Sequence, residues 1–129
     1  MWKMMKQVNE IVSYLVSVDA KRMISGSIVH TCDLYTPAKP KELSQIWSNK
    51  INQEFINQVK EEEKEGLPVT PFYVGLEDLK TRAKNETSFI AFIVMPLWKS
   101  LNELFDGNLD DLVGNCESNK KYWQDMLEN

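Results

Sequence analysis

The chain of 129 residues is long enough for one domain, and its 43% of hydrophobic residues is ordinary for a globular protein in water. Its formal net charge of −4 argues against a DNA- or RNA-binding protein, because such proteins need a basic face. No apolar run reaches the roughly 18–20 residues of a membrane span, so no membrane-spanning segment is expected.

Helical periodicity dominates the first part of the chain. Apolar side chains recur at steps of three and four residues, first at Ile11, Leu15 and Val18 and then at Met23, Ile24 and Ile28. This spacing predicts two successive helical segments. Asp19 is expected to cap the second segment, and Pro37 and Pro40 are expected to stop helical structure after Leu34.

A third helix is predicted to begin near Pro40, because proline is tolerated in the first turn of a helix. Its inward face is expected to be an apolar stripe made of Leu43, Ile46, Trp47, Ile51, Phe55 and Val59. The helix continues into the acidic run Glu61–Glu65, which is typical of a solvated face. Gly66 and Pro68 then break it, and residues 66–76 are predicted to form an irregular loop.

A fourth helix is predicted over about Glu77 to Phe105, with a bend or break near Pro96, which lacks an amide proton. A turn at residues 106–108 precedes a final helix over Leu109 to Leu127. The inward side chains of this last helix are expected to be Leu112, Val113, Cys116, Trp123 and Leu127. Because no stretch shows the alternation of a β-strand, the sequence predicts an all-α, multi-helix architecture.

Asp33 is the side chain that points most clearly to chemistry. It ends an apolar helical segment before a Pro-x-x-Pro turn, where a carboxylate is costly to bury unless a metal ion, a basic side chain or a cap pairs with it. An exposed acid at a helix end is the alternative. His30 can share a helical face with Asp33, but two residues are too few for a zinc site.

Nucleophilic catalysis finds no support in the residue types. Because His30 is the only histidine, no serine or cysteine nucleophile is expected to have a histidine base nearby. Cys32 and Cys116 show neither metal-ligand spacing nor the framework of a secreted disulfide protein. We therefore expect both cysteines to be buried free thiols and the location to be cytoplasmic.

Several ordered motifs resemble the C-terminal part of the catalytic domain of cyclic nucleotide phosphodiesterases. They are His30-Thr-Cys-Asp-Leu34, Thr36-Pro-Ala-Lys-Pro40, Trp47 with Glu54-Phe-Ile-Asn-Gln58, Gly66-Leu-Pro-Val-Thr-Pro71, Lys84-Asn-Glu-Thr-Ser-Phe-Ile-Ala-Phe-Ile-Val-Met-Pro-Leu-Trp98, and Asn119 with Trp123. The resemblance implies that residues 20–129 are the C-terminal portion of that all-α domain. Residues 1–19 are expected to be an N-terminal helix that the resemblance does not place.

The resemblance also implies roles for individual residues, although it implies no catalytic acid or base in this chain. The roles are Asp33 as the last metal ligand, Phe89 as the aromatic that stacks on the purine, Ile51 on the opposite side of the base, Glu86 at the position of a glutamine that contacts the purine edge, and Thr36, Trp47 and Ser48 in the pocket lining. Because an ionised glutamate only accepts hydrogen bonds, Glu86 could favour the amino group of adenine, disfavour the carbonyl of guanine, or mark lost base recognition.

The activity that the resemblance implies is hydrolysis of cAMP or cGMP to the 5′-monophosphate in a site with two divalent metals, zinc and magnesium in the complete domain. The family's other ligands lie in His-Asn-x-x-His and His-Asp motifs that this sequence lacks, so the chain alone is expected to be inactive. The alternatives are a non-catalytic module that binds nucleotide or associates with other phosphodiesterase chains, and an incomplete product without a fold of its own.

Overall fold

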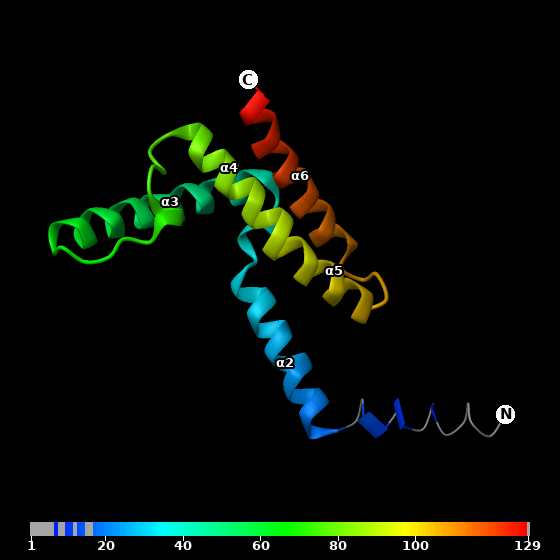
Figure 1. The fold of residues 1–129 in the computed structure, drawn as a ribbon. Coiled ribbons are helices and arrows are strands. Elements are labelled where there is room, and N and C mark those ends of the chain that lie inside the picture. Colours follow the sequence, from blue (N-terminus) through cyan, green and yellow to red (C-terminus); the bar gives the residue numbers. More distant parts are fainter. Residues whose placement is uncertain (1–6, 8–9, 12, 15–16, 129) are drawn as a thin grey trace. The chain divides into compact units, whose positions relative to one another are not determined.

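The computed structural model describes residues 7, 10–11, 13–14 and 17–128, and these residues contain helices and no β-strand (Figure 1). The all-α prediction is therefore confirmed. The chain divides into two compact units, residues 1–33 and 34–129. Most of the N-terminal helix expected over residues 1–19 lies outside the described residues.

The first unit contains helix α2, Val18–Asp33. The hydroxyl of Ser17 accepts a hydrogen bond from the amide of Ala20 at 3.1 Å, which is the geometry of an N-cap. Asp19 was expected in that role and instead lies inside the first turn, where its negative charge complements the helix dipole. The helix ends before the proline-containing turn, as the sequence predicts. The prediction that Cys32 is buried is wrong, because most side chains of α2, including that of Cys32, are exposed.

The second unit begins with a short 3₁₀ turn, Thr36–Ala38, and continues into α3, Lys41–Lys64. Three backbone carbonyls around this turn accept hydrogen bonds from two asparagines of the last helix, α6, Asp110–Glu128. Asn119 donates to the carbonyls of Pro37 and Lys39 at 2.8 and 2.9 Å, and Asn115 donates to that of Ala38 at 3.0 Å. The turn is therefore fixed to the last helix of the chain.

The predicted inward face of α3 is wrong for the first half of the helix. Its apolar side chains are exposed there, and the buried residues are instead Ser44, Ser48, Asn52 and Ile56, spaced by four. The physical reason is that α3 meets polar side chains of the next helix, so a polar face is turned inward. In the second half Phe55 is half-buried and stacks on Tyr73, with ring centres 4.0 Å apart.

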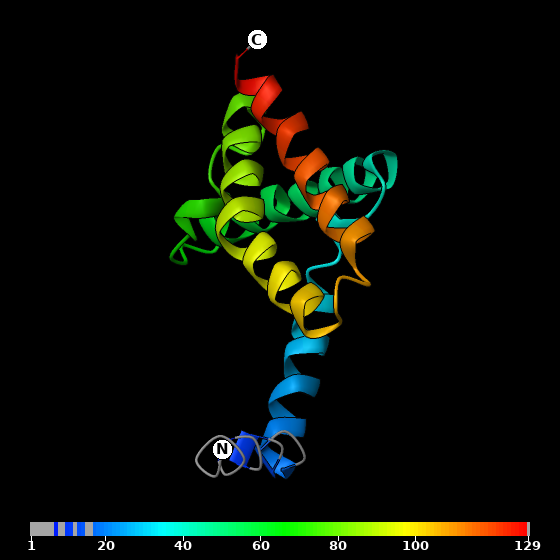
Figure 2. The same ribbon diagram turned by 90° about the vertical axis from the view of Figure 1, so that its right-hand side faces the viewer.

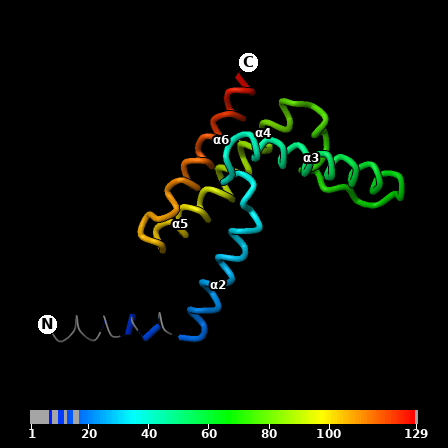
Figure 3. The backbone as a smooth tube through the Cα atoms, turned by 180° about the vertical axis from the view of Figure 1, so that it is seen from behind, coloured from blue at the N-terminus to red at the C-terminus, as the bar shows by residue number. Residues whose placement is uncertain are grey.

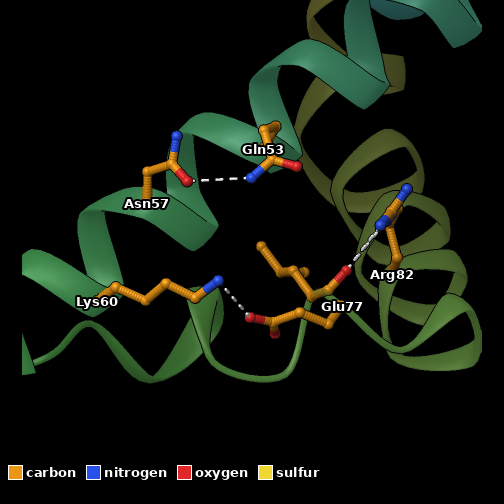
Figure 4. Close-up of polar contacts among 6 residues, drawn as sticks. Gln53, Asn57, Lys60, Glu77 and Arg82 are labelled. Carbon is orange, nitrogen blue, oxygen red and sulfur yellow. Dashed lines mark hydrogen bonds and ion pairs between the residues drawn. The ribbon is translucent and has the colours of Figure 1, made fainter.

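The segment between α3 and the next helix doubles back along α3 (Figure 3). Gly66 ends α3 with a positive φ of 67°, and the amide of Leu67 donates to the carbonyl of Glu62 at 2.8 Å, which is a Schellman-type ending. The expected loop contains a short 3₁₀ turn, Pro71–Tyr73. Figure 4 shows how its far end is tied down by an ion pair between Lys60 and Glu77 at 3.7 Å.

The predicted fourth helix is interrupted where expected, just before Pro96. It consists of α4, Leu79–Phe89, a π-helical turn, Ile90–Val94, and α5, Met95–Leu104. In the π-helical turn the amide of Met95 donates to the carbonyl of Ile90, five residues back. Pro96 lies in the first turn of α5 and cannot donate to the carbonyl of Phe92, so the regular α-helical hydrogen bonding is interrupted just before it.

Helix α6, Asp110–Glu128, packs along α4 and α5 (Figure 2). Cys116 and Trp123 are buried as predicted, whereas Leu112, Val113 and Leu127 are half-buried. The buried apolar side chains of the second unit are Ala38, Ile56, Leu76, Ala83, Ile90, Val94, Met95, Trp98, Leu101, Cys116 and Trp123. The core therefore lies between the last three helices and the turn before α3.

Candidate functional site

A polar cluster joins α3 to α4 and contains two of the residues that the sequence singled out. We call Ser48, Asn52 and Glu86 the α3–α4 cluster. The amide of Asn52 donates to Oε1 of Glu86 at 2.8 Å, and the hydroxyl of Ser48 donates to the same oxygen. Asn52 also donates to the backbone carbonyl of Ser48 at 2.8 Å. Ser48 and Glu86 are thus brought into direct contact.

The local sequence explains why the cluster forms. Ser48 and Asn52 are four residues apart and lie on one face of α3. One turn before Glu86 on α4, Arg82 donates to Oδ1 of Asn49 at 3.1 Å. These two cross-links between α3 and α4 lie one helical turn apart and fix the register of the two helices.

Arg82 also anchors the start of α4. Its Nε and Nη2 atoms donate to the carbonyl of Leu76 at 3.1 and 2.9 Å (Figure 4). Leu76 is buried, so the hydrogen bonds satisfy a backbone acceptor that water cannot reach easily. Arg82 is therefore committed to structure and is not free to serve as the cation for Glu86.

The carboxylate of Glu86 keeps one oxygen available. Both donors from α3 bind Oε1, and within the described residues Oε2 has no hydrogen-bond or ion-pair partner. Glu86 is half-buried, so its charge is partly removed from water without a cation beside it. The free oxygen is a fixed acceptor that suits an N–H donor of a ligand.

The remaining predicted pocket residues take varied positions. Phe89 is half-buried and follows Glu86 by three residues, so both lie on neighbouring positions of one α4 face. Thr36 is half-buried in the 3₁₀ turn, while Trp47 and Ile51 are exposed on α3. The clamp between Phe89 and Ile51 that the resemblance implies stays a prediction.

Asp33, the predicted metal ligand, is the exposed last residue of α2 and belongs to the first unit. Among residues 7, 10–11, 13–14 and 17–128, no three histidine, cysteine, aspartate or glutamate side chains gather in a way that could hold a metal ion. These donors therefore do not form a two-metal centre by themselves, and the role of Asp33 stays a prediction. None of the described helices has the length and apolar character needed to cross a lipid bilayer.

Asn52 is the site residue that the sequence analysis missed. The signal was available in the four-residue spacing of Ser44, Ser48 and Asn52, which marks a polar stripe on α3. The stripe was overlooked because the apolar residues of the same helix were assigned to the core. The missed residue holds Glu86 in place.

Comparisons with known proteins agree on one family. The family described as 3′5′-cyclic nucleotide phosphodiesterase matches residues 1–116. A probable 3′,5′-cyclic phosphodiesterase of Caenorhabditis elegans is 33% identical over 120 residues, which are 88% of this chain and 17% of that protein. The mouse 3′,5′-cyclic-AMP phosphodiesterase 4C is 31% identical over 101 residues, 78% of this chain and 14% of the relative.

A solved structure also resembles this chain closely. The crystal structure of the phosphodiesterase domain of a RhoPDE fusion protein from the choanoflagellate Salpingoeca rosetta has a TM-score of 0.80 and 32% identity. The match covers 98% of this chain and 40% of that one. The chain therefore spans less than half of the solved domain and less than a fifth of the two curated relatives.

Proposed function

Since the chain belongs to the 3′5′-cyclic nucleotide phosphodiesterase family, we propose that it forms the base-binding part of a domain that hydrolyses a 3′,5′-cyclic nucleotide to the 5′-monophosphate. The observation that carries this proposal is the α3–α4 cluster. It presents a fixed, half-buried acceptor on Glu86 three residues before the aromatic side chain of Phe89. A planar base with an N–H donor on its edge suits both groups.

In this proposal each side chain has one task. Oε2 of Glu86 accepts a hydrogen bond from the base, and Ser48 and Asn52 hold the carboxylate in position through Oε1. Phe89 stacks on one side of the base and Ile51 contacts the other, which is worth about 1–3 kcal/mol by analogy with other base-stacking proteins. Thr36 and Trp47 contribute to the wall of the pocket.

The free oxygen of Glu86 favours adenine over guanine where it meets the group at C6 of the purine. A carboxylate repels the exocyclic carbonyl of guanine and accepts a hydrogen bond from the exocyclic amino group of adenine. Because Oε1 already receives two hydrogen bonds, Oε2 is the only oxygen of Glu86 left for the base. The name of the mouse relative, a cyclic-AMP phosphodiesterase, supports the same choice.

The metal chemistry of the family requires more than these residues. Asp33 is the carboxylate that we propose as one ligand of the divalent metals, zinc and magnesium in the complete domain. With one histidine in 129 residues the chain offers few further donors, so we propose that it binds nucleotide without hydrolysing it by itself. A cytoplasmic location is part of the proposal and is supported by the free thiols of Cys32 and Cys116.

Nucleotide binding is tested by calorimetric titration and thermal unfolding of the full chain with cAMP and cGMP. We expect saturable binding of cAMP that is lost in Phe89→Ala and retained in Phe105→Ala, a matched control on an exposed aromatic at the end of α5. At a ligand concentration of 100 Kd the stabilisation should be about 2.7 kcal/mol. No stabilisation by either nucleotide at millimolar concentration would refute the proposed function.

Base preference is tested with Glu86→Gln. The amide adds an N–H donor that the carbonyl of guanine can accept, so the affinity for cGMP relative to cAMP should rise about tenfold, which corresponds to one hydrogen bond. An unchanged ratio would refute the role of Glu86 while leaving nucleotide binding intact. Turnover of cAMP by the purified chain with zinc and magnesium, abolished in Asp33→Ala, would show that the proposal of inactivity is wrong.

A further inference from the structure

The loop after α3 contains a hydroxyl group that the structure does not use. Thr70 stands between two prolines in the order Pro68-Val-Thr-Pro71. The prolines belong to the family's Gly-Leu-Pro-x-x-Pro motif, whereas Thr70 occupies a position that the motif leaves open. The threonine is therefore not explained by the family motif.

The side chain and the backbone of Thr70 are both accessible. Thr70 is exposed, and among the described residues no group forms a hydrogen bond with its hydroxyl. Its backbone is extended, with φ −71° and ψ 114°. The neighbouring residues that are also exposed are Leu67, Pro68, Pro71 and Phe72. The hydroxyl and the proline that follows it are therefore both open to a large partner.

This arrangement suits one class of enzyme, the protein kinases that phosphorylate threonine or serine directly before proline. A protein kinase positions the acceptor hydroxyl of its substrate against the γ-phosphate of ATP. Proline at the next position has no backbone N–H, so such a kinase has to accommodate the ring in place of a hydrogen bond. Thr70 offers the free hydroxyl on an extended backbone, and the exposed Pro71 offers the ring.

We propose that Thr70 accepts a phosphoryl group from a proline-directed protein kinase, and that the phosphate loosens the attachment of this loop to α3. In the reaction Oγ1 of Thr70 forms a bond to the γ-phosphorus of ATP, and the bond from that phosphorus to the β-phosphate oxygen breaks. The hydroxyl proton passes to the catalytic aspartate of the kinase, and ADP leaves. The modification of Thr70 does not depend on nucleotide binding at the α3–α4 cluster.

The charge beside the loop gives the phosphate its effect. The run Glu61–Glu65 contains four glutamates and one lysine, a net charge of −3. The amide of Leu67 donates to the carbonyl of Glu62 at 2.8 Å, so the loop begins directly beside this run. Thr70 follows three residues later, at most about 11 Å along the chain. Because a phosphate adds a charge of about −1.5 to −2 and the Debye length is about 8 Å at physiological salt, the two like charges repel each other over this range.

Two backbone amides report on the attachment of the loop. Tyr73 and Val74 donate to the carbonyls of Thr70 and Pro71 at 3.0 and 3.3 Å and close the 3₁₀ turn. The ring of Tyr73 also stacks on Phe55 of α3. A loop that moves away from α3 loses this stack and opens the turn, so both amides should exchange their hydrogen faster.

A second Thr-Pro pair provides a control within the same chain. Thr36 precedes Pro37, but Pro37 and Ala38 are buried. Asn119 donates to the carbonyl of Pro37 at 2.8 Å and holds the turn against α6. A kinase cannot reach the ring of Pro37 unless this turn unfolds, so the fold should select Thr70 over Thr36.

The site is tested by incubating the purified full chain with a mitogen-activated protein kinase, magnesium and ATP, and by locating the phosphate with mass spectrometry. We expect one phosphoryl group per chain, on Thr70. Thr70→Ser should keep the modification, whereas Thr70→Val and Pro71→Ala should lose it. A chain without phosphate on Thr70, or with Thr36 modified at an equal rate, would overturn the assigned site.

The effect on the loop is tested by hydrogen exchange of the phosphorylated and the unmodified chain. The amides of Tyr73 and Val74 should exchange roughly threefold faster with the phosphate, as screened repulsion at about 10 Å predicts. The difference should shrink in about 1 M salt, where the Debye length is about 3 Å. The buried residue Leu101 of α5 is the control, and its amide should exchange at the same rate in both chains. Equal exchange of Tyr73 and Val74 with and without the phosphate would overturn the proposed effect.

Discussion

Asn119→Ala should destabilise the second unit more than any other single truncation of a polar side chain in α6. Asn119 is 2% exposed, and its amide donates to the carbonyls of Pro37 and Lys39 at 2.8 and 2.9 Å. Alanine removes both hydrogen bonds and leaves the carbonyls without a donor. The 3₁₀ turn that carries Thr36 then loses its main attachment to α6.

The expected cost follows from three contributions. Two hydrogen bonds are worth about 1 kcal/mol each, and leaving a buried carbonyl unpaired adds about 1–3 kcal/mol. Against this, Oδ1 of Asn119 is buried without a partner, so its removal returns about 1 kcal/mol. The net loss in the free energy of unfolding should be about 2–4 kcal/mol.

The assay is urea unfolding followed by the fluorescence of the buried residues Trp98 and Trp123. Asn115→Ala is the matched control, because this half-buried side chain makes one such bond, at 3.0 Å, and should cost about 1 kcal/mol. Asn119→Asp should cost more than the alanine variant, since a carboxylate cannot donate to either carbonyl. If Asn119→Ala is no worse than Asn115→Ala, the turn is not held in the way the structure indicates.

Three further predictions concern separate features of the chain. Burial raises the pKa of the Cys116 thiol to about 12. A thiol reagent near pH 8 should therefore modify only the exposed Cys32 in the folded chain and both cysteines in urea. Labelling of both cysteines in the folded chain would contradict this. The hydrogen bond from the Thr81 amide lowers the pKa of Asp78 below its ordinary value of 3.8. The electrostatic part of its capping contribution should therefore be complete at neutral pH and decrease as the pH falls below 3.8. The urea midpoint of Asp78→Ala, measured by circular dichroism, should be lower than that of the original chain at neutral pH, and the difference should be smaller in acid; an equal difference at both pH values would contradict this. Phe55→Leu removes the stacked ring pair with Tyr73 and should lower the free energy of unfolding by about 0.5–1.5 kcal/mol more than the loss of buried area alone. The ring of Phe72 meets Tyr73 edge-on from an exposed position, so Phe72→Leu should lower it by less in the same urea assay.

Much of the fold follows from residues whose local effect is strong. Gly66 and Pro68 end α3 where the sequence predicts, because glycine adopts the positive φ that a helix ending needs. Pro96 predicts the interruption between α4 and α5, because it cannot donate to the carbonyl of Phe92. Such effects operate within a few residues and need no knowledge of the tertiary structure.

The errors concern choices that tertiary contacts decide. Ser17 and Asp19 are both good capping residues, and the sequence alone does not tell which one begins α2. The apolar stripe of α3 was assigned inward because periodicity identifies an apolar side without identifying its partner. The side chains that α4 presents, Arg82 and Glu86, made the polar side of α3 the buried one.

The candidate site was predicted in part. Ser48 and Glu86 came from the family resemblance, and the structure joins them through one carboxylate oxygen. Asn52 has no place in the quoted motifs; its four-residue spacing from Ser48 marks the polar stripe, but its bond to Glu86 could be found only once α3 and α4 were in contact. Asp33 lies in the other compact unit, and its proposed role rests on the resemblance alone.

The π-helical turn at Ile90–Val94 decides which side chains of α5 face the core. An i to i−5 bond accommodates one residue more than an α-helical turn does, and one residue corresponds to about 100° of rotation. Deleting any one of these five residues would let α4 and α5 merge into a continuous rod. The buried side chains of Trp98 and Leu101 would then rotate out of the core, so a single-residue deletion here should destabilise the protein far more than one in a loop.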